Sequence, residues 1–146
     1  MFMDTVDIAP VTLAATYAVP PELVFDAWVK PSLIHKWLFI GPTSEIVNIE
    51  IDLRPGGKFS IQELEKTTGE YIDHYGNYLE IDPPRKLVFT LAVPKHFPGE
   101  TNVTILIEAF AGGCILQLTQ AGVAKETTEA SWRKMLEQLK LTLENQ

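Results

Sequence analysis

The sequence lacks several features that would place it in a specialised class. It has one cysteine, Cys114, among 146 residues, so no disulfide can form within the chain, as suits a reducing compartment. No apolar run approaches the roughly 18 residues that a membrane helix needs. Met1–Asp4 show no basic segment followed by an apolar stretch, so we expect no signal peptide. These absences predict a cytoplasmic protein in which Cys114 is a small buried side chain.

Positive charge is also scarce. The chain has 12 Lys and Arg against 19 Asp and Glu, a net charge of −7. Its adjacent basic residues are the isolated pairs Arg85-Lys86 and Arg133-Lys134. Nucleic-acid-binding domains usually carry a basic face, and anionic membrane surfaces attract clustered Lys and Arg. We therefore expect neither nucleic acid nor a membrane as a partner.

Residues with metal-binding or nucleophilic chemistry are few. The three histidines, His35, His74 and His96, are far apart in the sequence, whereas structural zinc needs four ligands at characteristic spacings. Gly56-Gly57 lacks the spacing of a phosphate-binding loop, and no serine sits in a nucleophile-elbow motif. The sequence therefore predicts no metal, no cofactor and no recognisable catalytic set.

What the chain does have is patterned apolar sequence, with 46% hydrophobic residues. Alternation predicts one strand at 11–19 and about six more between residues 45 and 119. Arg54-Pro55-Gly56-Gly57 has the composition of a hairpin turn. Between the first strand and the others, two short apolar stripes ending at Trp28 and Trp37 predict two short helices.

One long amphipathic helix closes the chain. We expect it to span Lys125 to Leu143 and to lie on the concave face of the sheet. Its apolar residues recur at helical spacing on one stripe: Trp132, Met135, Leu136, Leu139 and Leu143. With no linker or repeat, residues 1–146 are predicted to form a single α+β domain.

Several segments, in order along nearly the whole chain, resemble the Hsp90 ATPase activator homologue family of the START-like, or Bet v 1-like, superfamily. They are Val24–Trp28, Lys30-Pro31, Trp37, Asp52–Phe59, Gly76–Glu80, Pro83–Phe89 and Asn102–Thr104. The resemblance implies a helix-grip fold, in which a curved antiparallel sheet grips the last helix around a hydrophobic cavity. It implies no universal catalytic residues, and this chain has Ser131-Trp132 where the family commonly has Gly-Trp.

The predicted site is a pocket between the sheet and the long helix, closed at one end by the two Trp-bearing helices. A pocket of this kind suits an apolar or aromatic small molecule held by a few polar groups. His74 and Tyr78 share one strand face and would supply the polar contacts, while the pattern leaves open which face points inward. The walls are predicted to be Trp28, Trp37, Phe39, Phe59, Phe89 and Met135.

Three functions remain open on this scaffold. The first is binding of a small hydrophobic molecule. The second is an enzyme of cyclase or hydrolase type that uses His74 or a buried carboxylate, recognisable by a perturbed titratable pair facing the pocket. The third is a chaperone-interaction module, implied by the family resemblance alone. Both a monomer and a homodimer are compatible with the sequence. The strand carboxylates are expected on the wet face of the sheet: Glu50, Asp52, Glu63, Glu65 and Glu80.

Overall fold

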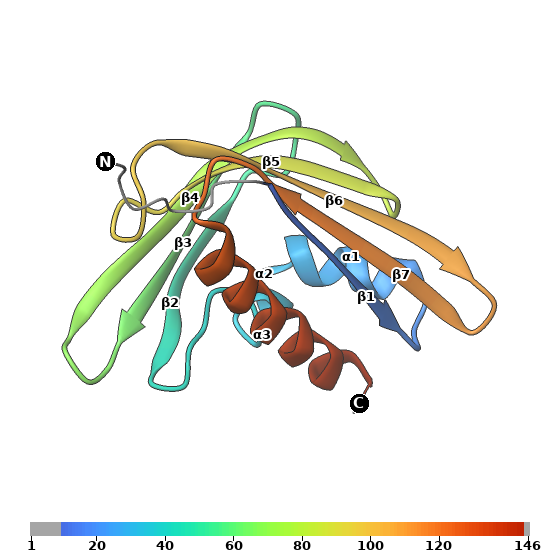
Figure 1. Cartoon of the computed structure of the whole chain (residues 1–146), viewed down its shortest axis with the longest axis horizontal. Helices are drawn as coiled ribbons and strands as arrows, with labels where there is room; N and C mark the ends of the chain where they lie inside the picture. The colour runs from blue at the N-terminus through green and yellow to red at the C-terminus, as the bar shows by residue number, and fades with distance from the viewer. Residues whose placement is uncertain (1–9, 145–146) are drawn as a thin grey trace, which may run out of the picture.

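The structure, a computed structural model, describes residues 10–144. Figure 1 shows one curved sheet with the helices on its concave side. This arrangement confirms the predicted α+β class. In chain order the elements are β1 (Val11–Tyr17), α1 (Pro21–Val29), α2 (Pro31–Ile34), β2 (Ser44–Ile51), β3 (Lys58–Glu65), β4 (Glu70–Asp82), β5 (Lys86–Ala92), β6 (Glu100–Phe110), β7 (Gly113–Gln120) and α3 (Lys125–Glu144).

The sheet is built from successive antiparallel hairpins. Its seven strands lie in the order β1-β7-β6-β5-β4-β3-β2, and every neighbouring pair is antiparallel. The strands β1 and β2 therefore form the two edges, and the chain passes from one edge to the other through α1 and α2 (Figure 1). A curved antiparallel sheet around one long terminal helix is the helix-grip fold that the resemblance implied.

The long helix α3 fills the concave face, as predicted (Figure 1). It is tied to the edge strand β1, because the hydroxyl of Tyr17 donates a hydrogen bond to the carbonyl of Leu136 over 3.1 Å. No helix within residues 10–144 is both long and apolar enough to cross a membrane. The buried residues of α3 belong to the predicted stripe: Trp132, Leu136, Leu139 and Leu143.

The first short helix lies where the sequence predicts it, and the second is shorter than predicted. Helix α1 starts with Pro21, because proline suits the first helical position, where no amide hydrogen is needed. Helix α2 has a single turn and ends at Ile34, so Trp37 lies after it rather than on it, which corrects the prediction. The amide of Trp37 bonds to the carbonyl of Ile34 over 3.2 Å, the tighter spacing of a 3₁₀ turn.

A buried hydrogen-bonded chain joins α3 to the middle of the sheet. The indole Nε1 of Trp132 donates to Oε1 of Gln120 over 2.8 Å. The Gln120 amide donates to the hydroxyl of Thr101 over 2.8 Å, and that hydroxyl donates to the carbonyl of Leu91 over 3.2 Å. Because a buried polar group without a partner is costly, these bonds fix the position of the Trp132 ring.

Strand β4 approaches its neighbour closely at one point, Gly76. A Cβ atom added there would lie 1.9 Å from the carbonyl oxygen of Thr90. The next residue along, Asn77, bonds through its amide to the hydroxyl of Thr90 over 2.9 Å. Only glycine permits this approach, which lies two positions from Tyr78 and two from His74 on the same strand.

The edge strand β2 contains a bulge that alternation does not reveal. Its register with β3 shifts between Ile46 and Asn48, so Val47 is turned outward and is 44% exposed. Strict alternation would place Val47 on the same face as Ile49 and Ile51, and the bulge prevents this. A bulge inserts one residue and reverses the faces on one side of it.

Replacing Leu139 by alanine is expected to lower the free energy of unfolding by about 2–5 kcal/mol, the usual effect of truncating a buried leucine. Leu139 is 0% exposed at the centre of the α3 stripe, whereas Leu141 on the same helix is 49% exposed. Leu141→Ala is the matched control and should change stability by less than about 0.5 kcal/mol. Urea unfolding of both variants measures the difference, and equal effects would show that the stripe does not face the core.

Replacing Gly76 by alanine is expected to cost about 1–3 kcal/mol or more, as overpacking does, because the new Cβ would meet the backbone of Thr90. Gly41→Ala is the control, since a Cβ there would meet only the Ser44 hydroxyl, at an ordinary 3.4 Å. Chemical denaturation of the two variants tests this. Wild-type stability in Gly76→Ala would mean that β4 and β5 are not held at this close approach.

Candidate functional site

The residues predicted to form a pocket lie together between the sheet and α3. Some of them line a void of about 10 Å³, which lies between the sheet, α1 and the turn after α2 and has no α3 residue in its lining. Its volume is close to the space of one water molecule. The sequence predicts a cavity of drug size, and the interior at this place is instead nearly solid. The void is lined by five of the eight predicted residues: Trp28, Phe39, Phe59, Tyr78 and Phe89.

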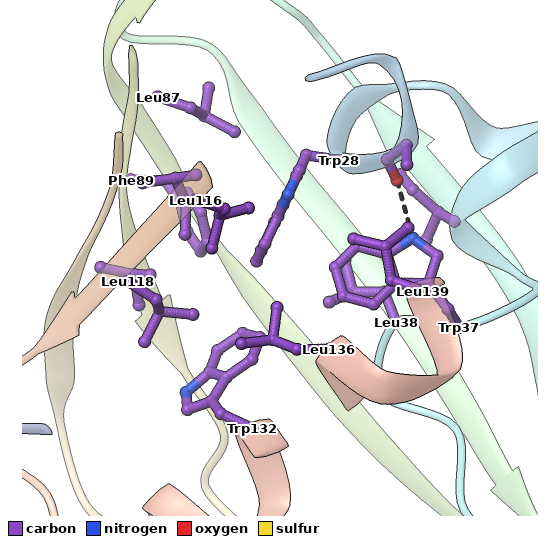
Figure 2. Packing of buried hydrophobic residues seen from close by; sticks show 14 of the residues in the cluster. Trp28, Trp37, Leu38, Leu87, Phe89, Leu116, Leu118, Trp132, Leu136 and Leu139 are labelled. Carbon is purple, nitrogen blue, oxygen red and sulfur yellow. Dashed lines mark hydrogen bonds between the residues drawn. The ribbon is translucent and has the colours of Figure 1, made fainter. Parts of the chain in front are cut away.

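The void is small because aromatic rings from different elements fill the space that the sheet encloses. In Figure 2 the ring of Trp28 points from α1 into the region between the sheet residue Phe89 and the ring of Trp37. The centroids of Trp28 and Trp37 are 4.7 Å apart with an angle of 81° between the planes. Trp132 lies 5.8 Å from Trp28 on the α3 side. Edge and tilted contacts of this kind are favourable aromatic arrangements.

Phe39 connects the remaining predicted residues to the void. Its ring lines the void and stacks on the imidazole of His74, with centroids 4.1 Å apart and planes 7° apart. Its amide donates to the sulfur of Met135 on α3 over 3.1 Å. Its φ is +62°, a left-handed conformation that is a real outlier for a bulky side chain. Phe39 is therefore held by its contacts in a conformation that costs energy.

His74 faces inward and forms a pair with Glu63 of β3. The two residues are diagonal neighbours, because His74 pairs with Ile61 in the β3–β4 register and Glu63 pairs with Ile72. Nε2 of His74 lies 3.0 Å from Oε1 of Glu63, and the side chains are only 6% and 12% exposed. The structure thus answers which face of β4 points inward: His74 and Tyr78 are both buried.

The protonation of this pair follows from burial and hydrogen bonding. Burial lowers the pKa of His74 by more than its hydrogen bond to Glu63 raises it. Burial opposes ionisation of Glu63, but hydrogen bonds from His74 and Ser44 outweigh it and lower the pKa of Glu63 below its ordinary value. Glu63 is therefore a carboxylate beside a neutral His74 at pH 7. Because a carboxylate only accepts hydrogen bonds, the imidazole proton is on Nε2 and Nδ1 is an acceptor.

Two buried polar atoms of the cluster have no hydrogen-bond partner within residues 10–144: Nε1 of Trp28 and Nδ1 of His74. The other two indoles are satisfied, since Nε1 of Trp37 donates to the carbonyl of Ala27 over 3.0 Å and Trp132 donates to Gln120. Buried polar groups are nearly always paired in folded proteins. The cluster therefore contains two buried polar atoms that the described protein atoms leave unsatisfied.

The family described as Activator of Hsp90 ATPase homolog 1-like protein matches residues 18–144 of this chain. The chain belongs to this family. The matched range includes every residue of the aromatic cluster and both members of the Glu63–His74 pair. The described fold is that expected of the family, and a protein built on it is a ligand-binding or co-chaperone-like scaffold.

Solved structures of similar proteins share the fold. A protein from Chromobacterium violaceum is 26% identical, with a TM-score of 0.85 over 92% of this chain and 96% of that one. One from Nitrosomonas europaea is 22% identical, with a TM-score of 0.79 over 95% and 96%. An AHSA1-like protein from Aeromonas hydrophila is 20% identical, with a TM-score of 0.80 over 93% and 92%. No curated protein matches the chain.

Glu63 belongs to this site, although the sequence did not predict it there. All strand carboxylates were expected on the wet face, and Glu63 corrects that expectation. The signal was present, because Glu63 follows Phe59 and Ile61 at the period of two that places side chains on one face of a strand, and both are buried. Ser44, which hydrogen-bonds Glu63, comes from the edge of the sheet and had no such signal.

The other candidate features lie away from this cluster. His35 and His96 are exposed, and Cys114 is buried in β7. No group of three or more potential metal ligands occurs in the described part of the chain. An open surface hollow lies between the β1–α1 link and the β6–β7 turn. Every residue that lines it is either apolar or a glycine. It offers no polar side chain to orient a ligand, unlike the interior cluster.

Acidification is expected to destabilise the protein through His74. In the unfolded chain a histidine has a pKa of about 6.5, while burial lowers the pKa of folded His74, so the unfolded state binds the proton first. The contribution of His74 to the free energy of unfolding is therefore fully present above about pH 6.5. It is lost as the pH falls toward the pKa of His74 in the folded protein. Urea unfolding between pH 7.5 and 5.5 measures it.

His74→Gln keeps an amide donor for Glu63 and should flatten this pH dependence. The control is His96→Gln, because His96 is exposed. It should leave the dependence close to that of the wild type. An unchanged slope in His74→Gln would show that His74 is not the titrating group.

Proposed function

We propose that this protein binds a small, largely apolar aromatic molecule in its interior, between α3 and the sheet. One observation carries the proposal: Nε1 of Trp28, a residue that lines the void, and Nδ1 of His74, which stacks on Phe39, are both buried without a partner among the described residues. Leaving a buried polar group unsatisfied costs about 1–3 kcal/mol. A ligand with matching polar atoms would recover that free energy on binding.

The composition of the cluster supports a ligand of this kind. Small-molecule sites are mostly apolar, with a few polar groups that fix the orientation of the ligand. Here the walls are aromatic and aliphatic, the two unpaired atoms supply one donor and one acceptor, and burial raises the pKa of Tyr78 so that its hydroxyl stays neutral. An anionic ligand would lose its hydration near the Glu63 carboxylate without gaining a cationic partner.

Binding must be coupled to movement of Phe39, because the void of about 10 Å³ admits no organic molecule. Phe39 is the element best suited to move. It lies in the turn after α2 rather than in a strand or helix, and its φ of +62° stores about 1–2 kcal/mol of backbone strain. Displacing its ring would enlarge the void by the space that the ring occupies.

Acid–base catalysis is the second candidate function, and the Glu63–His74 pair favours it. A carboxylate that fixes one imidazole nitrogen leaves the other as a base, the arrangement found behind activated nucleophiles. Binding and catalysis differ in the fate of the ligand. Mass spectrometry of molecules released from gently purified protein, before and after incubation, distinguishes an unchanged ligand from a converted one. Contact with a chaperone stays a prediction from family resemblance.

Titration with anisole, an apolar aromatic with one acceptor, tests binding directly. We expect saturable millimolar binding that shifts the indole N–H resonance of Trp28 downfield as it gains an acceptor. The N–H resonances of Trp37 and Trp132 are internal references, since both are already hydrogen-bonded. Two-dimensional ¹H–¹⁵N NMR separates the three signals.

Phe39→Ala should bind anisole more tightly than the wild type, because the space of the ring is then open. Phe39→Leu is a milder variant for use if the alanine form is poorly folded. Phe110→Ala is the control, since Phe110 is 50% exposed at the end of β6 and should not alter the affinity. No saturable binding in the wild type or the Phe39 variants would refute the proposed function.

A further inference from the structure

We propose that the ligand presents an uncharged carbonyl oxygen to the void, where that oxygen accepts hydrogen bonds from Nε1 of Trp28 and the hydroxyl of Tyr78. The apolar body of the ligand takes the space of the Phe39 ring, which borders the same void. This inference rests on the proposed function and deepens it by naming the polar group of the ligand. It assigns Trp28 and Tyr78 as the residues that select that group.

The void has two polar side chains in its lining, and both are buried. Trp28 comes from α1 and Tyr78 from β4, and each residue is only 3% exposed. Within residues 10–144, no charged side chain lines the void. Its other lining side chains are all hydrocarbon: Leu38, Phe39, Phe59, Ile61, Leu87 and Phe89. A polar ligand atom in the void therefore has Trp28 and Tyr78 as its side-chain partners.

These two polar groups are both available as hydrogen-bond donors. Nε1 of Trp28 has no partner in the described part of the chain. Burial raises the pKa of Tyr78, and no hydrogen bond contributes to that change, so its hydroxyl is neutral and unpaired within residues 10–144. An indole nitrogen can only donate, and a neutral tyrosine hydroxyl can donate as well. The side chains of the void thus call for an acceptor.

The size of the void suits a single oxygen atom. Its volume is about 10 Å³, the space of one water molecule. A carbonyl oxygen has two lone pairs, one for each donor. A water molecule could accept from the same two donors, but its own hydrogens would then face hydrocarbon side chains, and such unmade hydrogen bonds are costly. A carbonyl oxygen carries no hydrogen, so it satisfies both donors and leaves no polar group unpaired.

The surrounding charges favour a neutral carbonyl over a carboxylate. Burial lowers the pKa of His74, which stacks on Phe39, so that the imidazole is neutral at pH 7. Glu63 beside it is ionised. A buried carboxylate would gain two hydrogen bonds but no cation, and it would lose its hydration. An aryl ketone or aldehyde avoids this cost, and its ring matches the ring of Phe39 in size.

Acetophenone and α-methylstyrene are matched probes, because they share one shape and differ only in a carbonyl oxygen or a methylene group. We expect Tyr78→Phe to weaken acetophenone binding about fivefold, the value of one net hydrogen bond. The affinity for α-methylstyrene should change by less than about twofold. Comparing each probe with itself in two proteins removes the difference in hydration between the probes.

Tyr75→Phe is the control variant. It is the same substitution on the same strand, at a side chain that is 43% exposed, and it should leave both affinities unchanged. Phe39→Ala should strengthen the binding of both probes. Adding Tyr78→Phe to Phe39→Ala should again weaken acetophenone alone.

The second donor is tested in the wild-type protein, without a substitution. Acetophenone should move the Nε1–H resonance of Trp28 further downfield than α-methylstyrene does at saturation. Because both probes carry the same aromatic ring, ring-current shifts are common to both. The N–H resonances of Trp37 and Trp132 are references, since both already have acceptors.

The outcomes distinguish the two proposals. Saturable binding of both probes, with equal effects of Tyr78→Phe on the two affinities and no difference at Trp28, would overturn the inference and leave the proposed function standing. A selective Tyr78 effect without the Trp28 difference would overturn Trp28 as a donor, and the reverse would overturn Tyr78. Binding of neither probe, in wild type or in Phe39→Ala, would overturn the proposed function together with the inference.

Discussion

The position of the Trp132 ring is the constraint on which the interior depends. Its indole nitrogen is fixed by Gln120, which is fixed in turn by Thr101, so the ring is locked between α3 and three adjacent strands. Trp28 and Phe39 both pack on it, at 5.8 and 5.9 Å between centroids. Residues from α1 and from the turn after α2 are therefore positioned by a hydrogen-bonded chain that runs through β7, β6 and β5. Without that chain, neither the void nor the stack on His74 would have a defined geometry.

The interior consequently has two sides that differ in hydrogen bonding: a rigid side, where buried indole nitrogens are paired, and a loose side, where buried polar atoms are unpaired. On the rigid side, Trp132 and Trp37 have their indole nitrogens hydrogen-bonded, and β5, β6 and β7 pair with one another without a register shift. On the loose side, Trp28 and His74 each carry a buried polar atom without a partner, and Phe39 holds a strained backbone. Folded proteins keep such unfavourable features mainly where they serve a function. Their concentration at one place supports a binding site more strongly than the volume of the void does.

Much of the fold could be predicted because it follows from periodicity. The stripe from Trp132 to Leu143 defined α3, and Arg54-Pro55-Gly56-Gly57 defined the β2–β3 turn. The errors arose where a tertiary contact overrides the local pattern. The bulge at Val47 reverses a face, and the 3₁₀ turn at Trp37 ends a helix that spacing would continue. Glu63 was misplaced because a carboxylate suggests solvent, although its strand position beside Phe59 and Ile61 pointed inward.

The volume of the pocket could not be predicted, for a physical reason. The aromatic residues that would line a cavity are the same residues that can fill it, and the choice depends on rotamers and on the path of one turn. Moving the Phe39 ring out of the core costs about 1.5–3 kcal/mol of lost burial. Release of its left-handed backbone returns about 1–2 kcal/mol, so the closed state is favoured by only about 1 kcal/mol. A preference of that size lowers the apparent affinity of a ligand by about fivefold. The closed interior and a ligand-binding function are therefore compatible, because one buried hydrogen bond to a ligand is enough to offset the cost of opening.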